Sequence, residues 1–359
     1  MKMDANIERQ RRKDEHVYFA VAQHQTKTTS QFDELELIND AVPMLNLADV
    51  DLSGEVAGLE FEIPLYINAM TGGSPHTEKL NGQLAEVAAA TGLMMAVGSM
   101  HAAIREPELA STYSIVREKH PNGVLFANIS ADLTPEQAQK AVDILQADAL
   151  QIHVNVAQEL VMKEGSREFD HWLDNIAAIK EQVDVPIIVK EVGFGLARKT
   201  IMRLRDINVD IIDLAGKGGT DFARIENARR RDGKWDYFND WGQTTAQSLI
   251  AIQSPNYVNM PYFASGGVRH PLDAIKCLAL GAEAVGIAGV ILAYLKEHDV
   301  EETIEWVETW KEQMKMIAVM VNAKNLSKLR KVPVITYGRL KEWGELRGVK
   351  LEQLAQRLM

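Results

Sequence analysis

The chain has 359 residues, of which 46% are hydrophobic and 25% are charged, a composition typical of a globular protein with a large buried core. Its formal net charge of −11 argues against nucleic acid or an anionic membrane surface as the main partner, because both attract basic surfaces. The single cysteine, Cys277, excludes an internal disulfide framework and is typical of a reducing cytosol.

The first residues are charged and no apolar segment follows them, so we expect no secretory signal. No apolar run approaches the roughly 20 residues that span a bilayer. We therefore expect a cytoplasmic protein that binds neither nucleic acid nor membrane.

Residues 1–60 form an N-terminal extension, with a helix expected near Asn6–Gln23. Within it, Arg9–His16 reads RQRRKDEH. Mixed-charge helical runs are usually solvent-exposed, and by itself this one predicts a solvated helix face.

From about residue 60 onward, short apolar runs alternate with amphipathic segments. Each run is continuous and apolar, which is typical of strands buried on both faces of a parallel sheet. One amphipathic segment, Thr134–Ile144, opens with Thr-Pro-Glu-Gln, where Thr134 can cap a helix and Pro135 suits its first turn. The predicted strands are Pro64–Ala69, Met94–Val97, Val124–Asn128, Ala149–His153, Pro186–Lys190, Asp210–Leu214, Tyr262–Ser265 and Ala284–Ile287.

Eight β–α alternations predict an α/β protein with a closed (β/α)8 TIM barrel. An open doubly wound sheet is the main rival, but the first strand lacks the glycine fingerprint of that fold. We expect one domain, with the extension at 1–60, the barrel core at 61–300 and C-terminal helices at 301–359. Residues 216–245 form a long charged loop after strand six, which predicts a lid or binding loop.

Two further features concern packing. Cys277 lies in a predicted helix and is expected to be a small core residue. Ile317, Met320 and Val321 recur at helical spacing, and this stripe either packs on the barrel or contributes to a homo-oligomer.

Polar residues gather where the predicted strands end, which is where active sites of these barrels form. They include Asn68 to Gly73, Ser99 and His101, Asn128, His153 to Glu159, Lys190-Glu191 and Gly216 to Thr220. After strands seven and eight come Ser265-Gly266-Gly267-Val268-Arg269 and Gly286-Ile287-Ala288-Gly289. Glycines there let backbone N–H groups approach a phosphate, although they can also serve only tight turns.

Lys190 ends a buried strand, so it needs an anionic partner or loses its proton. A reduced flavin, a Schiff base with substrate and an ion pair with Glu191 or another carboxylate are all consistent with this position. His153 and Asn155 should point the same way, into the barrel mouth, with Gln158 and Glu159 in the following loop. Glu159 is then either a Mg²⁺ ligand or a surface residue.

Together these residues resemble type 2 isopentenyl-diphosphate isomerase from about residue 6 to about residue 325. The segments that carry the resemblance are Arg12-Lys13 with His16, Met70 to Gly73, Gln151-x-His153-x-Asn155-x-x-Gln158-Glu159, Lys190-Glu191, Gly218 to Thr220, Ser265 to Arg269 and Ala288-Gly289.

The resemblance implies roles for particular residues. It implies substrate recognition by Arg12, Lys13, Ser99, His101, His153, Asn155 and Gln158, with Mg²⁺ on Glu159. Some family members carry Gln-Arg where this chain has Met100-His101, so the contact from His101 would be weaker and pH-dependent. It implies FMN bound by Ala69, Met70, Thr71, Ser99, Asn128, Lys190, Thr220, Gly266, Gly267, Arg269, Ala288 and Gly289.

The implied reaction converts isopentenyl diphosphate to dimethylallyl diphosphate without net redox change. Reduced FMN would do the acid/base work, and Lys190, Gln158 and His153 are the candidate catalytic residues. NADPH is the expected reductant, and a tetramer or octamer is expected. The alternatives are an FMN-dependent 2-hydroxy-acid oxidase and a non-catalytic flavin- or phosphate-binding barrel.

Overall fold

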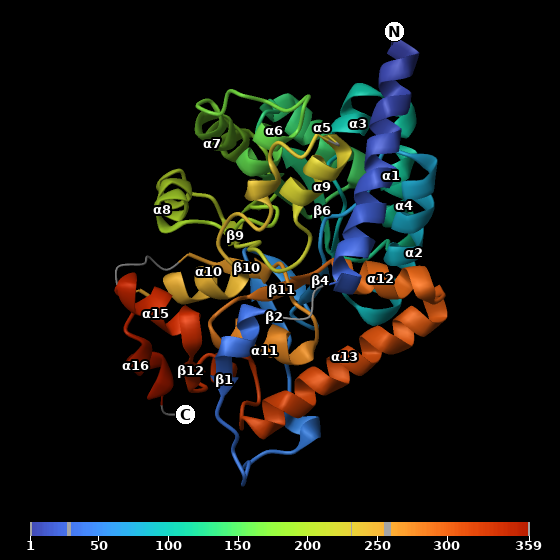
Figure 1. The fold of residues 1–359 in the computed structure, drawn as a ribbon. Helices are drawn as coiled ribbons and strands as arrows, with labels where there is room; N and C mark the ends of the chain where they lie inside the picture. Colours follow the sequence, from blue (N-terminus) through green and yellow to red (C-terminus); the bar gives the residue numbers. More distant parts are fainter. Residues whose placement is uncertain (1, 27–29, 231, 255–259, 358–359) are drawn as a thin grey trace.

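A closed barrel of eight parallel strands forms the centre of the protein in a computed structural model that describes residues 2–26, 30–230, 232–254 and 260–357 (Figure 1). Neighbouring strands follow chain order, and the pairing of the last strand with the first closes the barrel. The predicted (β/α)8 barrel is therefore confirmed. The barrel strands are β4 (Leu65–Ile67), β5 (Met94–Ala96), β6 (Leu125–Ser130), β7 (Ala149–His153), β8 (Ile187–Lys190), β9 (Ile211–Asp213), β10 (Tyr262–Ser265) and β11 (Ala284–Ile287).

The inside of the barrel is a packed core. The rings of Tyr66, Phe126 and Phe263 are fully buried and lie within 5.4–6.3 Å of one another, centroid to centroid. These strands are short and apolar because helices cover their outer face while side chains fill their inner face. Polar chemistry is thereby confined to the ends of the strands.

Helices surround the barrel. Helix α5 begins as its sequence predicted, since the Thr134 side chain accepts the N–H of Gln137 and Pro135 occupies the first turn. Cys277 lies fully buried in α11, as expected of a core residue. The surrounding helices are α2 (Pro75–Thr91), α3 (His101–Arg105), α4 (Ser111–Lys119), α5 (Pro135–Leu145), α7 (Trp172–Gln182), α8 (Arg198–Asp206), α10 (Thr245–Ala251), α11 (Pro271–Ala279) and α12 (Gly289–Glu297).

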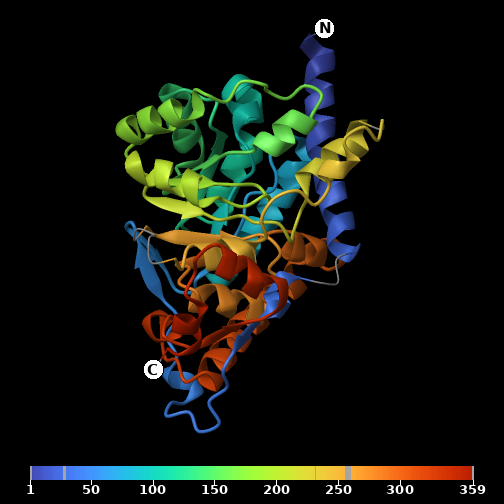
Figure 2. The same ribbon diagram turned by 60° about the vertical axis from the view of Figure 1, so that its left-hand side comes forward.

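The N-terminal helix α1 (Lys2–Thr26) runs along the side of the barrel and projects beyond it (Figures 1 and 2). Val17 is its buried apolar contact, and polar side chains tie it down at several points. Asp14 accepts a hydrogen bond from Ser74 Oγ over 2.8 Å, and the Gln23 amide bonds to both N and O of Asp221. The predicted helix is confirmed.

The segment that follows α1 and the C-terminal segment lie side by side at the end of the molecule away from the N-terminus (Figure 1). The N-terminal segment adds η1 (Gln31–Glu34), β1 (Leu35–Leu37), η2 (Leu47–Asp49) and the hairpin of β2 (Gly54–Val56) and β3 (Leu59–Phe61). The C-terminal segment adds α13 (Val300–Met320), α14 (Leu326–Leu329), β12 (Val334–Thr336), α15 (Gly338–Leu346) and α16 (Leu351–Ala355). Strand β12 pairs antiparallel with β1, which no local pattern indicated.

The segment 216–245 is not the plain loop that we expected. It contains α9 (Phe222–Arg230) and η4 (Asp236–Phe238), and Lys217 pairs with Thr244 to close its base. The many charged residues of α9 led us to predict a loop, although Ala223 and Ile225 form a buried face of the helix. Within the described residues, no helix combines the length and apolar character needed to cross a membrane.

Two of the three residues in the stripe near the C-terminus pack on the barrel, as one of the two alternatives predicted. Val321 is buried and Ile317 packs against the barrel core, whereas the Met320 side chain is 49% exposed.

Candidate active site

A cavity of about 880 Å³ opens at the carboxyl ends of the barrel strands. Every residue that the sequence proposed for flavin, substrate or metal lines it, except Thr71, which is buried. Pockets for small ligands commonly measure about 300–1,000 Å³. This cavity lies near the upper limit, so it can hold a flavin mononucleotide beside a small substrate.

The glycine loop after β10 forms one wall. Gly266 and Gly267 have φ values of 95° and 75°, a left-handed conformation that favours glycine. A Cβ atom on Gly266 would lie 2.0 Å from the carbonyl oxygen of Gly216. These glycines therefore allow the loop after β10 to pack tightly against the loop that contains Gly216. Their backbone also faces the cavity. Helix α12 begins at Gly289 on the same wall, and its first N–H groups have no partner within the helix.

Arg269 lines the cavity, but its guanidinium is already neutralised. Its Nε donates to Asp273 Oδ2 over 2.8 Å and its Nη1 donates to Asp33 Oδ2 over 3.1 Å. Hydrogen bonds to Asp273 and Asp33 raise the pKa of Arg269 above its usual value despite partial burial. An incoming phosphate would have to compete with both carboxylates.

Lys190 ends β8 with 5% of its surface exposed, and it faces the cavity. Its ammonium donates to the backbone oxygen of Glu191 over 2.8 Å. The Glu191 carboxylate instead accepts N–H bonds from Val192, Gly193 and Phe194, and burial raises its pKa to about 7. A direct ion pair between these two side chains was one predicted alternative, and it is wrong, because the turn after β8 occupies the carboxylate.

His153 is a neutral imidazole in this site. Burial, together with the charges of Lys190 and Lys13, lowers its pKa to about 3. Its Nδ1 lies 2.8 Å from Asn128 Oδ1, while Asn128 Nδ2 donates to Gln151 Oε1 over 3.1 Å. With the amides so oriented, Nδ1 carries the proton and Nε2 is an acceptor.

Gln158 and Glu159 lie in a helix, α6 (Val156–Val161), and the predicted loop is wrong here. The helix begins directly after Asn155, whose Nδ2 donates to Gln158 Oε1 over 3.1 Å and to Glu159 Oε1 over 3.0 Å. Ser166 N donates to Glu159 Oε2 over 2.7 Å. The helix thus brings the amide and the carboxylate to one side of the cavity.

Within the described residues, no group of three potential metal-ligating side chains gathers at one place. Glu159 could hold Mg²⁺ only with oxygens from substrate and water, which is how proteins commonly bind this ion.

The two predicted cations of α1, Arg12 and Lys13, both reach the cavity. Lys13 Nζ donates to Ser99 O over 3.4 Å, and burial, aided by the Arg12 charge, lowers the pKa of Lys13 to about 8. Arg12 Nη1 lies 3.2 Å from Glu164 Oε1. The local pattern predicted a solvated helix face, and this is wrong for both residues, because the barrel mouth covers them. His101 opens α3 and also lines the cavity.

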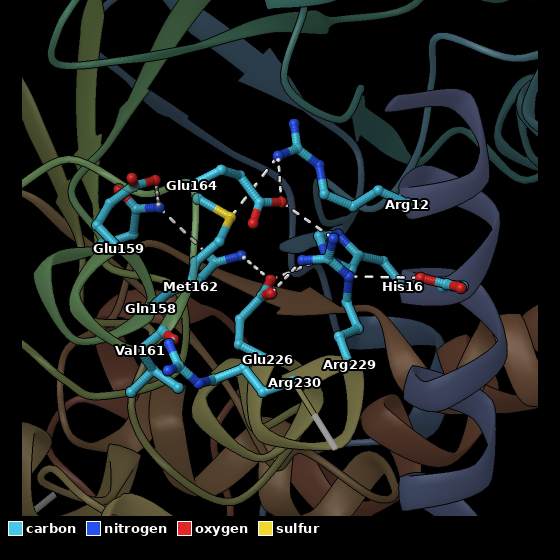
Figure 3. Close-up of polar contacts among 12 residues, drawn as sticks. Arg12, His16, Gln158, Glu159, Val161, Met162, Glu164, Glu226, Arg229 and Arg230 are labelled. Carbon is cyan, nitrogen blue, oxygen red and sulfur yellow. Dashed lines mark hydrogen bonds and ion pairs between the residues drawn. The ribbon is translucent and has the colours of Figure 1, made fainter. Parts of the chain in front are cut away.

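The cavity wall contains a polar network that the sequence did not reveal, with Glu226 buried behind the lining residues (Figure 3). Glu226 of α9 is 1% exposed and accepts hydrogen bonds from Gln158 Nε2 over 3.2 Å and from His16 Nε2 over 3.0 Å. Arg229 pairs with Glu226 and also with Glu164 over 3.0 Å. The network therefore joins α1, α6 and α9 around Gln158.

Arg229 opens a run of three arginines in the charged segment 216–245, and this network largely buries it; Arg231 lies outside the described residues. Burial raises the pKa of Glu226, but the His16 hydrogen bond and the Arg229 charge outweigh it and lower the pKa overall. A charge within an amphipathic stretch at 222–230 was the only local signal that could have indicated Glu226.

Comparison with known proteins gives consistent results. A family model described as FMN-dependent dehydrogenase matches residues 116–334. Proteins named isopentenyl-diphosphate delta-isomerase from Listeria welshimeri and Staphylococcus haemolyticus are 48% and 45% identical to this chain, over 99% and 97% of it. The matches cover 100% and 99% of those relatives.

Solved structures with the same fold are much more distant in sequence. A mandelate oxidase variant with a monooxide FMN adduct superposes with a TM-score of 0.60 at 13% identity, covering 90% of this chain and 92% of that one. A flavocytochrome b2 variant with benzoylformate gives 0.61 at 16% identity, covering 85% and 76%. At such identities the likeness concerns the fold alone.

Proposed function

The chain belongs to the family of isopentenyl-diphosphate delta-isomerases, and we propose that it converts isopentenyl diphosphate to dimethylallyl diphosphate on reduced FMN, with Mg²⁺ holding the diphosphate. The observation that carries the proposal is a single cavity where a buried lysine, a glycine loop and cations from α1 meet. The lysine and the glycine loop suit a flavin mononucleotide, and the cations suit a diphosphate.

The residues present suit FMN. Lys190 presents a buried ammonium to the cavity with a backbone carbonyl as its hydrogen-bond partner, so it can receive an anionic ring. When bound and reduced, FMN supplies an electron-rich ring face and a proton at N5. The residues that would hold it are Ala69, Met70, Thr71, Ser99, Asn128, Lys190, Thr220, Gly266, Gly267, Arg269, Ala288 and Gly289.

The opposite wall suits a diphosphate. Arg12 and Lys13 carry positive charge there, and an incoming anion would raise the pKa of Lys13 from about 8 and complete its protonation. His101, Ser99 and Asn155 add polar atoms. Glu159 would be the charged protein ligand of a Mg²⁺ ion that also binds the phosphate oxygens.

His153 contributes as a neutral group. Its Nε2 can accept a hydrogen bond at neutral pH but cannot donate to a phosphate until it gains a proton. The Asn128 and Gln151 amides fix the ring orientation. His153 therefore acts through position and hydrogen bonding in this proposal.

The reaction requires protonation of an isolated alkene, which produces a tertiary carbocation-like centre. Two features of the chain would favour it: Lys190 would stabilise negative charge on the ring side, and the α1 cations would orient the substrate through its diphosphate. Gln158 also lines the cavity. Its amide is held at one end by Asn155 and at the other by Glu226.

Three further points belong to the proposal. NADPH is the reductant that we propose for FMN, and the cytoplasm is the proposed location, supported by one cysteine in a long chain. We also propose a homo-oligomer, a tetramer or octamer. Exposed apolar side chains near the pairing of β1 with the C-terminal segment support it, namely Val42, Met44, Met316 and Met320.

A 2-hydroxy-acid oxidase needs a histidine base near the flavin. His153 has a pKa of about 3, too low for a base that works near neutral pH. His270 caps α11, accepting the N–H of Asp273. Neither histidine supports that alternative.

The deciding experiment is an anaerobic assay with isopentenyl diphosphate and Mg²⁺, with FMN oxidised in one sample and reduced in the other. Conversion only with reduced FMN, and without net consumption of NADPH, is expected. Lys190→Ala should lose turnover while it still binds FMN, whereas Lys311→Ala, on α13 outside the cavity, is the matched control and should keep it. A yellow protein inactive in both redox states would contradict the isomerase and leave a flavin-binding barrel.

A further inference from the structure

A buried carboxylate, Asp213, lies in the barrel and has no part in the reaction described above. It ends β9 and is 0% exposed. Tyr66 OH donates to its Oδ2 over 2.5 Å, Ser265 Oγ donates to its Oδ1 over 2.8 Å, and Ala215 N donates to its Oδ1 over 3.2 Å. All three partners can donate, so the arrangement matches an ionised carboxylate, which only accepts.

The barrel makes room for this cluster. A Cβ atom on Gly286 would lie 2.5 Å from the Tyr66 ring and 2.9 Å from Ser265 Cβ, so only glycine lets Tyr66 cross the barrel interior to reach Asp213. The surrounding interior is otherwise packed with aromatic rings. A charge in such surroundings costs free energy unless it is paired or hydrogen-bonded.

The strand register shows which cation this charge serves. His153 of β7 pairs in register with Lys190 of β8, and Lys190 pairs in register with Asp213 of β9. Residues in register on neighbouring strands point to the same side of a sheet, so the three side chains form a row on the inner face of the barrel. His153 and Lys190 line the cavity, and Asp213 is sealed beneath it.

Lys190 and Asp213 do not form a direct ion pair in the described part of the chain. The Lys190 ammonium bonds to the Glu191 backbone oxygen, and an ammonium has three donors. Its remaining N–H groups are thus available to a ligand in the cavity, while Asp213 acts on it through space. A direct ion pair would have used the donors that a ligand needs.

We propose that Asp213 is a positioning residue that keeps Lys190 protonated, so that the cavity offers a full positive charge to the anionic reduced flavin. The inference rests on the proposed function, because it assigns the ammonium of Lys190 to that flavin. Burial lowers the pKa of Lys190, and the charges of Asp213 and then Glu191 oppose this effect. His153 and Lys13 are the other titratable groups nearby, and Lys190 in turn lowers the pKa of His153.

The first test needs neither flavin nor turnover. In the apoprotein with ¹³C-labelled lysine, the Lys190 signal is assigned by its loss in Lys190→Met and titrated against pH. We expect Lys190 to be protonated at about pH 7.5 in the parent and its pKa to fall by at least about one unit in Asp213→Asn, a tenfold change in the ratio of charged to neutral amine. A Lys190 that is already neutral at this pH in the parent overturns the proposal, even if Asp213→Asn does not fold.

The second test measures binding of oxidised and reduced FMN separately. Asp213→Asn should weaken binding of reduced FMN at least tenfold more than binding of oxidised FMN. Lowering the pH protonates Lys190 in this variant and should restore its binding of reduced FMN. Tyr66→Phe keeps the carboxylate charge while it removes one donor, so it should show less than about a threefold change. In a Lys190→Met background, Asp213→Asn should have no further effect on this preference.

An equal loss for both forms of FMN, or the same effect in the Lys190→Met background, would mean that Asp213 acts only on the fold. Absence of isomerase activity in a parent protein with a normal Lys190 titration would remove the proposed function and leave the Lys190–Asp213 relation standing.

Discussion

The buried imidazole of His153 should make the stability of the apoprotein depend on pH. Folding lowers its pKa from 6.5 to about 3, first through burial and then through the charges of Lys190 and Lys13. Because the folded-state pKa is depressed, the unfolded chain binds more protons between these two values. This contribution to stability is therefore complete above about pH 6.5 and is lost as the pH falls toward 3.

The magnitude follows from the two pKa values. The whole shift corresponds to about 5 kcal/mol, since one pKa unit corresponds to about 1.36 kcal/mol. At about pH 5, which is 1.5 units below the unfolded-state pKa, about 2 kcal/mol of this is lost relative to about pH 7.5. That is a large part of the 5–15 kcal/mol by which domains are typically stable.

The assay is urea unfolding of the apoprotein at about pH 7.5 and pH 5. His153→Gln removes the titrating group, so its free energy of unfolding should fall by about 2 kcal/mol less between the two pH values than that of the parent. His298→Gln, at the C-terminal end of α12 and not among the cavity-lining residues, is the matched control and should behave as the parent does. Equal losses in the parent and in His153→Gln would refute the buried neutral imidazole.

Glu226→Gln should lower the free energy of unfolding by about 3 kcal/mol and reduce turnover, because Arg229 and Gln158 both lose a buried charged partner. The surface variant Glu86→Gln should change neither the free energy of unfolding nor the turnover in the same assays. Parent-like stability and turnover in Glu226→Gln would contradict the network. Glu159→Gln should raise the Mg²⁺ concentration for half-maximal activity about tenfold, and an unchanged metal titration would count against the ligand assignment. Gly266→Ala should weaken FMN binding at least about tenfold in a fluorescence titration, because its methyl group would collide with the neighbouring loop; full affinity would show that the loop can shift.

Much of the barrel could be predicted because its signals are local. Each strand is an uninterrupted apolar run, and β7, β10 and β11 have the bounds that were predicted. The cap of α5 needed only Thr134 and the residues that follow it. The polar residues at the strand ends converge on one cavity because the carboxyl ends of parallel strands must meet at one end of a barrel.

Other features could not be predicted, because they depend on partners far away in the chain. Glu226 meets His16 across 210 positions, and only the docking of α1 decides that both are buried. The residues of α9 look like a charged loop in sequence and α6 has only six residues, and the burial of one face of each segment makes it a helix.

The sequence by itself therefore determined the barrel, the end of it that carries the site and most of the residues that surround the cavity. The tertiary structure alone decided the electrostatics: which charges are buried, which are neutralised by a partner and which remain for a ligand. The physical reason is that apolar periodicity is a property of neighbouring residues in the sequence. Desolvation and charge pairing depend instead on residues that are distant in the sequence and come into contact only in the folded barrel. Arg269 shows this most clearly, since its position was evident from the glycine loop and its two carboxylate partners were not.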